Sequence, residues 1–330
     1  MKRMIKLRAL CLLVSLLTIS SWAQSPYIMA VDEYVPAPGQ FINTLPAYDE
    51  GDDAFSMAEK CTEAIADNAG GMVCLGAWGG YITFHFDHPI INVADCRDLR
   101  ILGNAYEGNS EPGIIMVSQD ENNNGLPDDR WYEISGSADI DSIGSVWYDY
   151  EVDYSIGEAE EIVWTDNRGN TGTIQRNSFH TQPYFPQWLS VPLSFHGTRL
   201  PDNAYDKSGK GSYWIHETLR YGYADNVSNN DTEGCSIDLS WAVDPITREP
   251  VHLTHADFIR VYSGCLQSCG WIGETSTEIC GATDLHPQAT LDDAAIIQVY
   301  IDRQQTVCYD LLGRRIEQSY NHQNKLIIIH

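Results

Sequence analysis

The most specific chemical pattern in the sequence is an acidic segment, residues 120–129, which reads DENNNGLPDD. Calcium takes about six to eight hard oxygen atoms in proteins, and calcium-binding loops supply them at alternate positions with a glycine at the sixth. Gly125 occupies that sixth position. The oxygen donors that the spacing assigns to the ion are Asp120, Asn122, Asn124, the carbonyl of Leu126, Asp128 and Asp129. The segment therefore predicts a calcium site.

The loop departs from an EF-hand where the bidentate glutamate is expected, because Trp131 stands there and Asp129 or Glu133 would have to complete the shell. No helical pattern flanks the segment. It is thus predicted to be a single calcium loop between strands, similar to the loops of thrombospondin type 3 repeats and dockerins. The alternative is a polar turn without an ion. Calcium is favoured because only Arg130 is near enough in sequence to neutralise the mutually repelling carboxylates.

Aromatic side chains are abundant, and their flat rings could stack on a sugar or on a planar ligand. Two clusters, residues 147–150 and 213–214, fall in stretches rich in loop-forming residues. The predicted ligand-binding residues within them are Trp147, Tyr150, Tyr213 and Trp214. Three other aromatic residues are predicted to belong to the core, namely Trp164, Trp241 and Tyr262.

Catalytic motifs are absent: the sequence has no nucleophile elbow, no HExxH zinc motif, no phosphate-binding loop and no dinucleotide-binding glycine pattern. A carboxylate pair that hydrolyses glycosides would leave no motif. The candidates for such a pair are Glu111, Glu133, Glu274 and Glu278. We expect a binding protein without catalytic residues. The alternatives are a glycan-active hydrolase and a structural or adhesive protein without a small ligand.

The first 23 residues have the features of an export signal. Basic residues at positions 2, 3, 6 and 8 precede an apolar run over residues 9–19, and Ser21-Trp22-Ala23 is a small-x-small cleavage site. The segment holds four of the 20 basic residues and no acidic one, which leaves 16 basic against 46 acidic residues and a net charge of −30. Such a charge repels nucleic acids, so no nucleic-acid partner is expected. We expect a secreted or outer-membrane surface protein, with the periplasm as the alternative.

The rest of the chain alternates short β-type runs with clusters of glycine, proline, asparagine and aspartate, a pattern typical of a β-sandwich. One helix is predicted over residues 53–68, where apolar residues recur at helical spacing before Gly70-Gly71. The predicted strands are residues 81–86, 99–102, 114–118, 131–134, 162–165, 189–195, 236–241, 258–262 and 277–280. Residues 153–188 are interpreted as a long excursion between strands.

A change in composition near residues 286–291 predicts a boundary. We expect a signal peptide (1–23), a β-sandwich that carries the calcium loop (24–288) and a small C-terminal β-unit (289–330). The eight cysteines outside the signal are irregularly spaced, so they form either buried thiols or one or two local disulfides. No second cysteine pair accompanies Cys265 and Cys269 at zinc-binding spacing.

Several segments resemble a group of Bacteroidetes cell-surface proteins with a galactose-binding-like jelly roll. They are GGYITFHFDHPI (79–90), DLRILGNAY (98–106), SEPGIIMVS (110–118), the calcium loop with WYE (131–133), WAVD (241–244), DFIRVY (257–262) and GETSTEI (273–279). The resemblance implies an all-β, jelly-roll-type sandwich. Some of these proteins are encoded near outer-membrane nutrient receptors, including those for cobalamin. It therefore implies capture of a glycan or another nutrient ligand, with such a receptor as a partner, without naming the ligand.

The tail has a resemblance of its own. YDLLGRRI (309–316) and KLIII (325–329) are similar to the C-terminal sorting domain of type IX secretion. This implies that the secretion machinery is a partner. The tail is shorter than usual and lacks a glycine before its final strand, so a non-functional remnant is the alternative.

Overall fold

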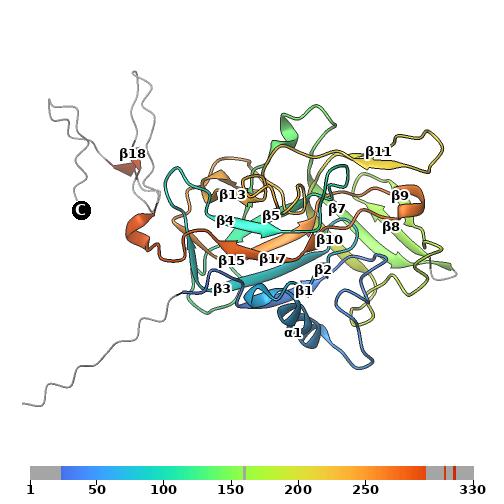
Figure 1. Cartoon of the computed structure of the whole chain (residues 1–330), viewed down its shortest axis with the longest axis horizontal. Coiled ribbons are helices and arrows are strands. Elements are labelled where there is room, and N and C mark those ends of the chain that lie inside the picture. Colours follow the sequence, from blue (N-terminus) through green and yellow to red (C-terminus); the bar gives the residue numbers. More distant parts are fainter. Residues whose placement is uncertain (1–23, 159–160, 295–307, 310–314, 317–330) are drawn as a thin grey trace, which may run out of the picture.

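The computed structural model describes residues 24–158 and 161–294 and the short segments 308–309 and 315–316. Its largest sheet has six strands, each antiparallel to its neighbours. In spatial order they are β1 (Ala30–Val35), β3 (Tyr81–Ile91), β15 (His255–Ser263), β5 (Gly113–Ser118), β6 (Trp131–Ile134) and β14 (Ala242–Val243). Figure 1 shows β3, β15 and β5 running across the centre of the molecule.

Smaller antiparallel sheets accompany this one. One sheet contains β13 (Ser236–Ile237), β4 (Leu99–Leu102) and β17 (Gly281–Asp284), and another contains β10 (Leu193–Arg199), β7 (Trp147–Ile156), β8 (Ile162–Asp166) and β9 (Thr171–Ile174). The remaining pairs are β2 (Val73–Cys74) with β16 (Glu278–Ile279), β11 (Ala204–Asp206) with β12 (Trp214–His216), and β18 (Cys308–Tyr309) with β19 (Arg315–Ile316). The predicted all-β, sandwich-like class is confirmed. The jelly-roll connectivity stays a prediction.

The main hydrophobic core joins the six-stranded sheet to the β13-β4-β17 sheet. Ile82 and Phe84 of β3 and Ile259 of β15 are fully buried in one cluster with Leu99 and Ile101 of β4. Side chains two residues apart in a strand point to the same face, so each strand contributes one face to this core. Burial of each such side chain stabilises the fold by about 1.5–3 kcal/mol.

The α-helix of the described part, α1 (Ala54–Ile65), packs against β1 and closes one side of the core. It begins at Asp53, whose carboxylate accepts the Ser56 N–H at 2.9 Å while the Ser56 hydroxyl accepts the Asp53 N–H at 2.9 Å. This reciprocal capping satisfies two donors that the helix start would leave unpaired. The predicted helix is confirmed, but it ends at Ile65 rather than residue 68, because a separate 3-10 turn with a left-handed Asp67 follows over Ala66–Asn68.

The four-stranded sheet corrects the prediction that residues 153–188 form an excursion. Tyr150, Val152 and Tyr154 of β7 are buried, whereas Glu151 and Asp153 are exposed. The buried face joins a second core around Trp78. The prediction was wrong because acidic residues occupy the solvent-facing positions of a regularly alternating strand.

Two further strand predictions need adjustment. The strand predicted over residues 189–195 begins only at Leu193 and runs to Arg199 as β10. The strand predicted over residues 236–241 ends after Ile237, because Asp238 caps a 3-10 turn over Leu239–Trp241 by accepting the Ser240 N–H at 2.8 Å.

Several predictions concern residues that the structure does not describe. The signal peptide (1–23) and most of the C-terminal β-unit (289–330) lie outside the described residues, so export and sorting stay predictions. Within the described part, no helix is long and apolar enough to cross a membrane. The cysteines with free thiols are Cys61, Cys74, Cys96, Cys235, Cys265, Cys269 and Cys280. For these seven, the buried or half-buried thiol is the alternative that the structure supports.

Candidate functional site

The predicted calcium loop connects two neighbouring strands of the large sheet. β5 pairs with β6 up to Ser118 and Trp131, so the segment between them closes a hairpin whose two ends are fixed. Inside the loop the Asp120 carboxylate accepts the N–H groups of Asn124 at 3.0 Å and Gly125 at 2.8 Å. Gly125 has a φ of +73°, which a glycine adopts without strain. The backbone therefore folds tightly around Asp120.

The asparagine side chains of the loop donate hydrogen bonds to its carboxylates. The Asn122 amide donates to Asp128 at 3.0 Å and to Asp129 at 3.3 Å, and the Asn124 amide donates to Asp128 at 3.0 Å. The nitrogen and oxygen of an asparagine amide exchange places by a half-turn. The same side chains can thus present oxygens to a cation held between them and Asp128. The structure brings together Asn122, Asn124, Asp128 and Asp129, with Asp120 at the base of the loop.

The one basic residue expected to neutralise the loop is engaged elsewhere. Arg130 forms an ion pair with Asp244, and its guanidinium lies 5.3 Å from the ring centre of Tyr132. The loop is mostly exposed, so its carboxylates are open to ions from solvent. A divalent cation remains the simplest counter-charge for this cluster. Of Leu126 the structure shows an exposed side chain, which suits a residue that contributes only its carbonyl.

A second acidic cluster lies inside the protein. Ligand oxygens of Glu111, Asp225 and Glu278 come within 4.8 Å of one another. Asp225 and Glu278 are 3% and 4% exposed, and Glu111 is half-buried. This buried triad is the one set of three acidic, histidine or cysteine ligands at such spacing in the described residues. The carboxylates of residues 120–129 form no such set among the described residues, so a cation in the predicted calcium loop would also need amide and carbonyl oxygens.

Backbone donors hold the central member of the buried triad. The Asp225 carboxylate accepts the N–H groups of Asn104 at 2.7 Å, Ala105 at 2.8 Å and Glu278 at 2.9 Å. Asn104 also donates its side-chain amide to Glu278 at 3.1 Å. Because these partners belong to three segments far apart in the sequence, the triad ties those segments together.

Burial changes the acidity of the triad. Desolvation raises the pKa of Asp225 to about 6, and desolvation together with the charge of Asp225 raises the pKa of Glu278 to about 8. The pKa of Glu111 is also raised well above its usual value, first by desolvation and then by the charges of Glu278 and Asp225. Three negative charges this close together in a buried space would raise the free energy of the folded state. Protons or a cation must offset them.

The triad contains two of the four glutamates that the sequence suggests for a glycosidase pair. Glu111 and Glu278 were candidates and do come together, whereas Glu133 lies elsewhere and pairs with Arg248 at 2.9 Å. Glu274 is also buried and accepts the Gln40 N–H at 2.5 Å. Asp225 was missed, because nothing in its local sequence signals a partner at residue 111 or 278. The burial of Asp225 and Glu278 leaves little access for a sugar.

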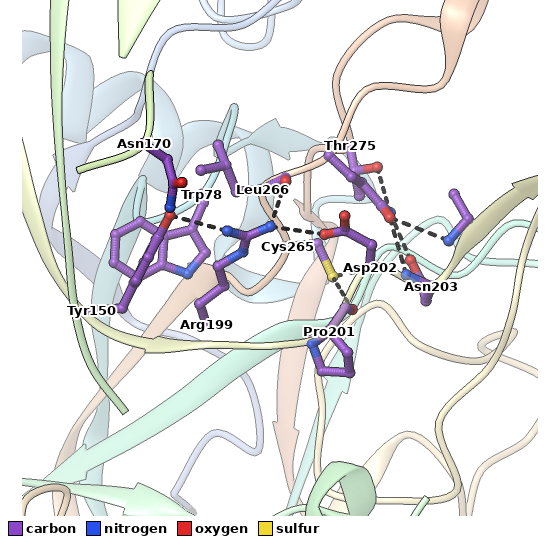
Figure 2. Close-up of polar contacts among 12 residues, drawn as sticks. Trp78, Tyr150, Asn170, Arg199, Pro201, Asp202, Asn203, Cys265, Leu266 and Thr275 are labelled. Carbon is purple, nitrogen blue, oxygen red and sulfur yellow. Dashed lines mark hydrogen bonds and ion pairs between the residues drawn. The ribbon is translucent and has the colours of Figure 1, made fainter. Parts of the chain in front are cut away.

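The prediction that Tyr150 binds a ligand is wrong. It is fully buried in β7 rather than in a loop, its hydroxyl donates to Asp166 at 2.7 Å, and Arg199 donates to that hydroxyl at 3.0 Å. Figure 2 shows Arg199 between Tyr150 and Asp202, to which it donates at 3.0 Å. Tyr150 therefore offers no surface for stacking.

Trp147 also lies in β7 and is half-buried. The guanidinium groups of Arg168 and Arg199 lie 4.7 and 5.1 Å from the centre of its indole ring. Cations at this distance are attracted by the ring face. The structure thus gives Trp147 two partners of its own, which a stacking ligand would have to displace.

In the second aromatic cluster only Tyr213 is exposed, and the Lys207 ammonium lies 5.6 Å from its ring centre. Tyr213 is 53% exposed and Trp214, at the start of β12, is half-buried. The indole N–H of Trp214 is buried and has no hydrogen-bond partner among the described residues. Of the residues predicted for the core, Tyr262 is buried, while Trp164 and Trp241 are half-buried against core clusters.

Comparison with known proteins gives no further assignment. No protein-family model matches the chain, and a search of curated proteins finds no match.

Proposed function

We propose that this chain is an exported, calcium-binding β-sandwich protein that captures a glycan or another nutrient ligand at the cell surface. The observation that carries the proposal is the convergence of Asn122, Asn124, Asp128 and Asp129 in a hairpin loop folded around Asp120. An outer-membrane uptake receptor, such as that for cobalamin, is the partner that the family resemblance suggests.

Calcium in the loop acts on the stability of the sheet. The loop joins β5 to β6, and both strands belong to the six-stranded sheet that forms one side of the main core. An ion that crosslinks the two halves of the loop restrains the hairpin. It also neutralises carboxylates for which Arg130, paired with Asp244, is not available.

Ligand capture is supported by the exposed ring of Tyr213, which adjoins the half-buried Trp214. A surface with a net charge of −30 disfavours anionic ligands and favours neutral or cationic ones. Stacking on aromatic rings depends little on salt, whereas ion pairs between exposed groups are screened within about 10 Å at 0.1 M.

A glycan-active hydrolase is the second candidate, and the proximity of Glu111 and Glu278 is the observation that favours it. Their raised pKa values are typical of catalytic acids. The burial of Asp225 and Glu278, at 3% and 4% exposure, favours a structural role instead. Release of reducing sugar from a bound glycan, lost in Glu278→Gln, would support the hydrolase.

Thermal unfolding in calcium and in chelator tests the calcium site. A ligand at a hundredfold excess over its dissociation constant stabilises the folded state by about 2.7 kcal/mol. For a chain of this size we expect chelator to lower the melting temperature by about 4–5 °C. Asp120→Ala should abolish the response to calcium, whereas Asp292→Ala, an exposed aspartate outside the loop, should keep it. An unchanged melting temperature in chelator would mean that the loop is a polar turn without a bound ion.

A further inference from the structure

A pocket lies beside the calcium loop, at an irregularity in the pairing of the two central strands. Ala256 of β15 pairs with Ile90 of β3, and Phe258 pairs with His85. Four residues of β3, 86–89, therefore stand opposite the single residue Asp257. An excess of this kind makes a strand bulge away from its partner and re-aims its side chains.

The bulge leaves a cavity of about 250 Å³. Its walls come from the bulged segment of β3 and from Asp257 and Phe258 of β15 on one side, and from Asp120 and Gly125 of the calcium loop on the other. The site predicted from the sequence thus forms one wall of a pocket that the sequence did not reveal.

The pocket is negatively charged. Its lining contains three aspartates, Asp87, Asp120 and Asp257, and no lysine or arginine. Two of these aspartates already have polar partners. His88 and the Ser25 N–H contact Asp87, and His255 and the Asp120 N–H contact Asp257.

The two histidines in the lining also face carboxylates, and one of these is Asp87 of the pocket itself. His85 contacts Asp32 at 2.9 Å, and His88 lies between Asp87 at 2.5 Å and Asp284 at 2.6 Å. The remaining walls are apolar and include Phe86 and Phe258. Both rings are only 5% exposed, so the pocket offers carboxylates beside mainly apolar walls, which suits a small organic cation with a carbon skeleton.

A bare metal ion fits this pocket less well. No three acidic, histidine or cysteine ligand atoms of its lining come within 4.8 Å of one another, since the described residues contain one such set and it is the buried triad. A protonated amine needs only one or two carboxylates and fills the remaining volume with its carbon skeleton.

Asp120 links this pocket to the loop. Its backbone N–H donates to the Asp257 carboxylate at 2.8 Å, while its own carboxylate holds the N–H groups of Asn124 and Gly125. An ion that fixes Asp120 also fixes the pocket wall. Two sites that share a positioned residue are coupled, and the coupling is reciprocal.

We propose that the pocket binds a small organic amine through Asp257 and Asp87 and that calcium in the adjacent loop strengthens this binding. The second half of the proposal rests on the calcium site proposed above, and the first half does not.

Titration of the mature protein with cyclohexylamine and with cyclohexanol, followed by NMR of backbone amides, tests the pocket. The two probes match in size and differ in charge at pH 7. We expect saturable shifts at Phe86 and Phe258 and an affinity at least tenfold higher for the amine. Asp257→Asn and Asp87→Asn should each weaken amine binding several-fold or more, whereas Asp292→Asn should not. Equal binding of both probes, no saturable shift, or unchanged affinity in both pocket variants would overturn the proposal.

Repeating the amine titration in chelator tests the coupling. We expect a weaker affinity by about threefold or more in wild type and no effect of chelator in Asp120→Ala. If chelator lowers the melting temperature but leaves amine affinity unchanged, the calcium site stands and the coupling is wrong. If the amine binds and chelator changes neither property, the pocket stands and the calcium site is wrong.

Discussion

The calcium loop and the buried triad are both clusters of acidic side chains, but they solve the problem of charge repulsion in different surroundings. The loop takes all its members from ten consecutive residues and is mostly exposed. The triad takes Glu111, Asp225 and Glu278 from distant segments, and it buries Asp225 and Glu278 while Glu111 is half-buried. An exposed cluster can recruit a cation from solvent, whereas burial penalises the charged form itself and favours protons. Surroundings, more than residue type, decide how each cluster is neutralised.

The largest expected effect comes from truncating the centre of the triad. Asp225→Ala removes the acceptor of three buried backbone N–H groups, which should lower the free energy of unfolding by about 3–5 kcal/mol. Chemical denaturation in chelator measures it. Asp225→Asn is the matched variant: its one acceptor oxygen can keep the Asn104 and Ala105 N–H groups, but its NH2 group then faces the Glu278 N–H, so it should cost less than alanine and still destabilise the fold. In the loop, Asp128→Ala should have no measurable effect in chelator. A loss as large in Asp128→Ala as in Asp225→Ala would erase the distinction between the two clusters.

The next effect is a dependence of stability on pH, to which the triad contributes together with the buried carboxyls of Asp98 and Glu274, whose pKa values desolvation raises to about 7. The pKa values of Asp225 and Glu278 are raised to about 6 and about 8, so the folded state binds more protons than the unfolded state. The free energy of unfolding should therefore fall as the pH rises from about 4, where the unfolded groups titrate, to about 8.

Denaturation at several pH values in chelator measures this slope. Glu278→Gln should flatten it between about pH 5 and 8, because the group that takes up the proton is gone. Asp120→Ala, in the loop, should leave it intact. Asp98, Asp225 and Glu274 keep part of the slope in this variant. A slope as steep in Glu278→Gln as in wild type would mean that Glu278 is already ionised in the fold.

The smallest effect should come from adding a charge to the exposed cluster. Asn124→Asp supplies a further carboxylate to the loop, and calcium affinity rises with the number of charged ligands. We expect calorimetry to show a calcium affinity several-fold higher than in wild type, and a slightly lower melting temperature in chelator. Asn230→Asp, exposed and outside the loop, should change neither. Weaker calcium binding in Asn124→Asp would place residue 124 outside the metal shell.

The sequence predicts most reliably what adjacent residues determine. The strands at residues 99–102 and 131–134 have the predicted bounds, and the helix follows from its capping residue and apolar spacing. β1 and β7 were missed because acidic residues interrupt their apolar pattern, as Asp32 and Glu33 do in β1. The alternation of Tyr150, Val152 and Tyr154 could have revealed both β7 and the burial of Tyr150.

The candidate sites follow the same division. The loop is a local pattern, so its members could be named in advance. The triad and the bulge pocket depend on tertiary pairing: Asp225 meets Glu278 through a backbone hydrogen bond, and Asp257 meets residues 86–89 only because β15 pairs with β3. No spacing within a single segment encodes those contacts.

The pairing of β3 with β15 also has a consequence for how the chain folds. Tyr81 pairs with Tyr262, so the two central strands of the main sheet are separated by more than half the chain. Contacts at such separation form slowly because a long loop must close before any pairing is gained. A chain that emerges from its N-terminus first must keep one side of β3 unpaired until residue 263 is free. During that interval an apolar strand edge is open to pairing with other chains, and a chaperone that shields it would decide the yield of folded protein.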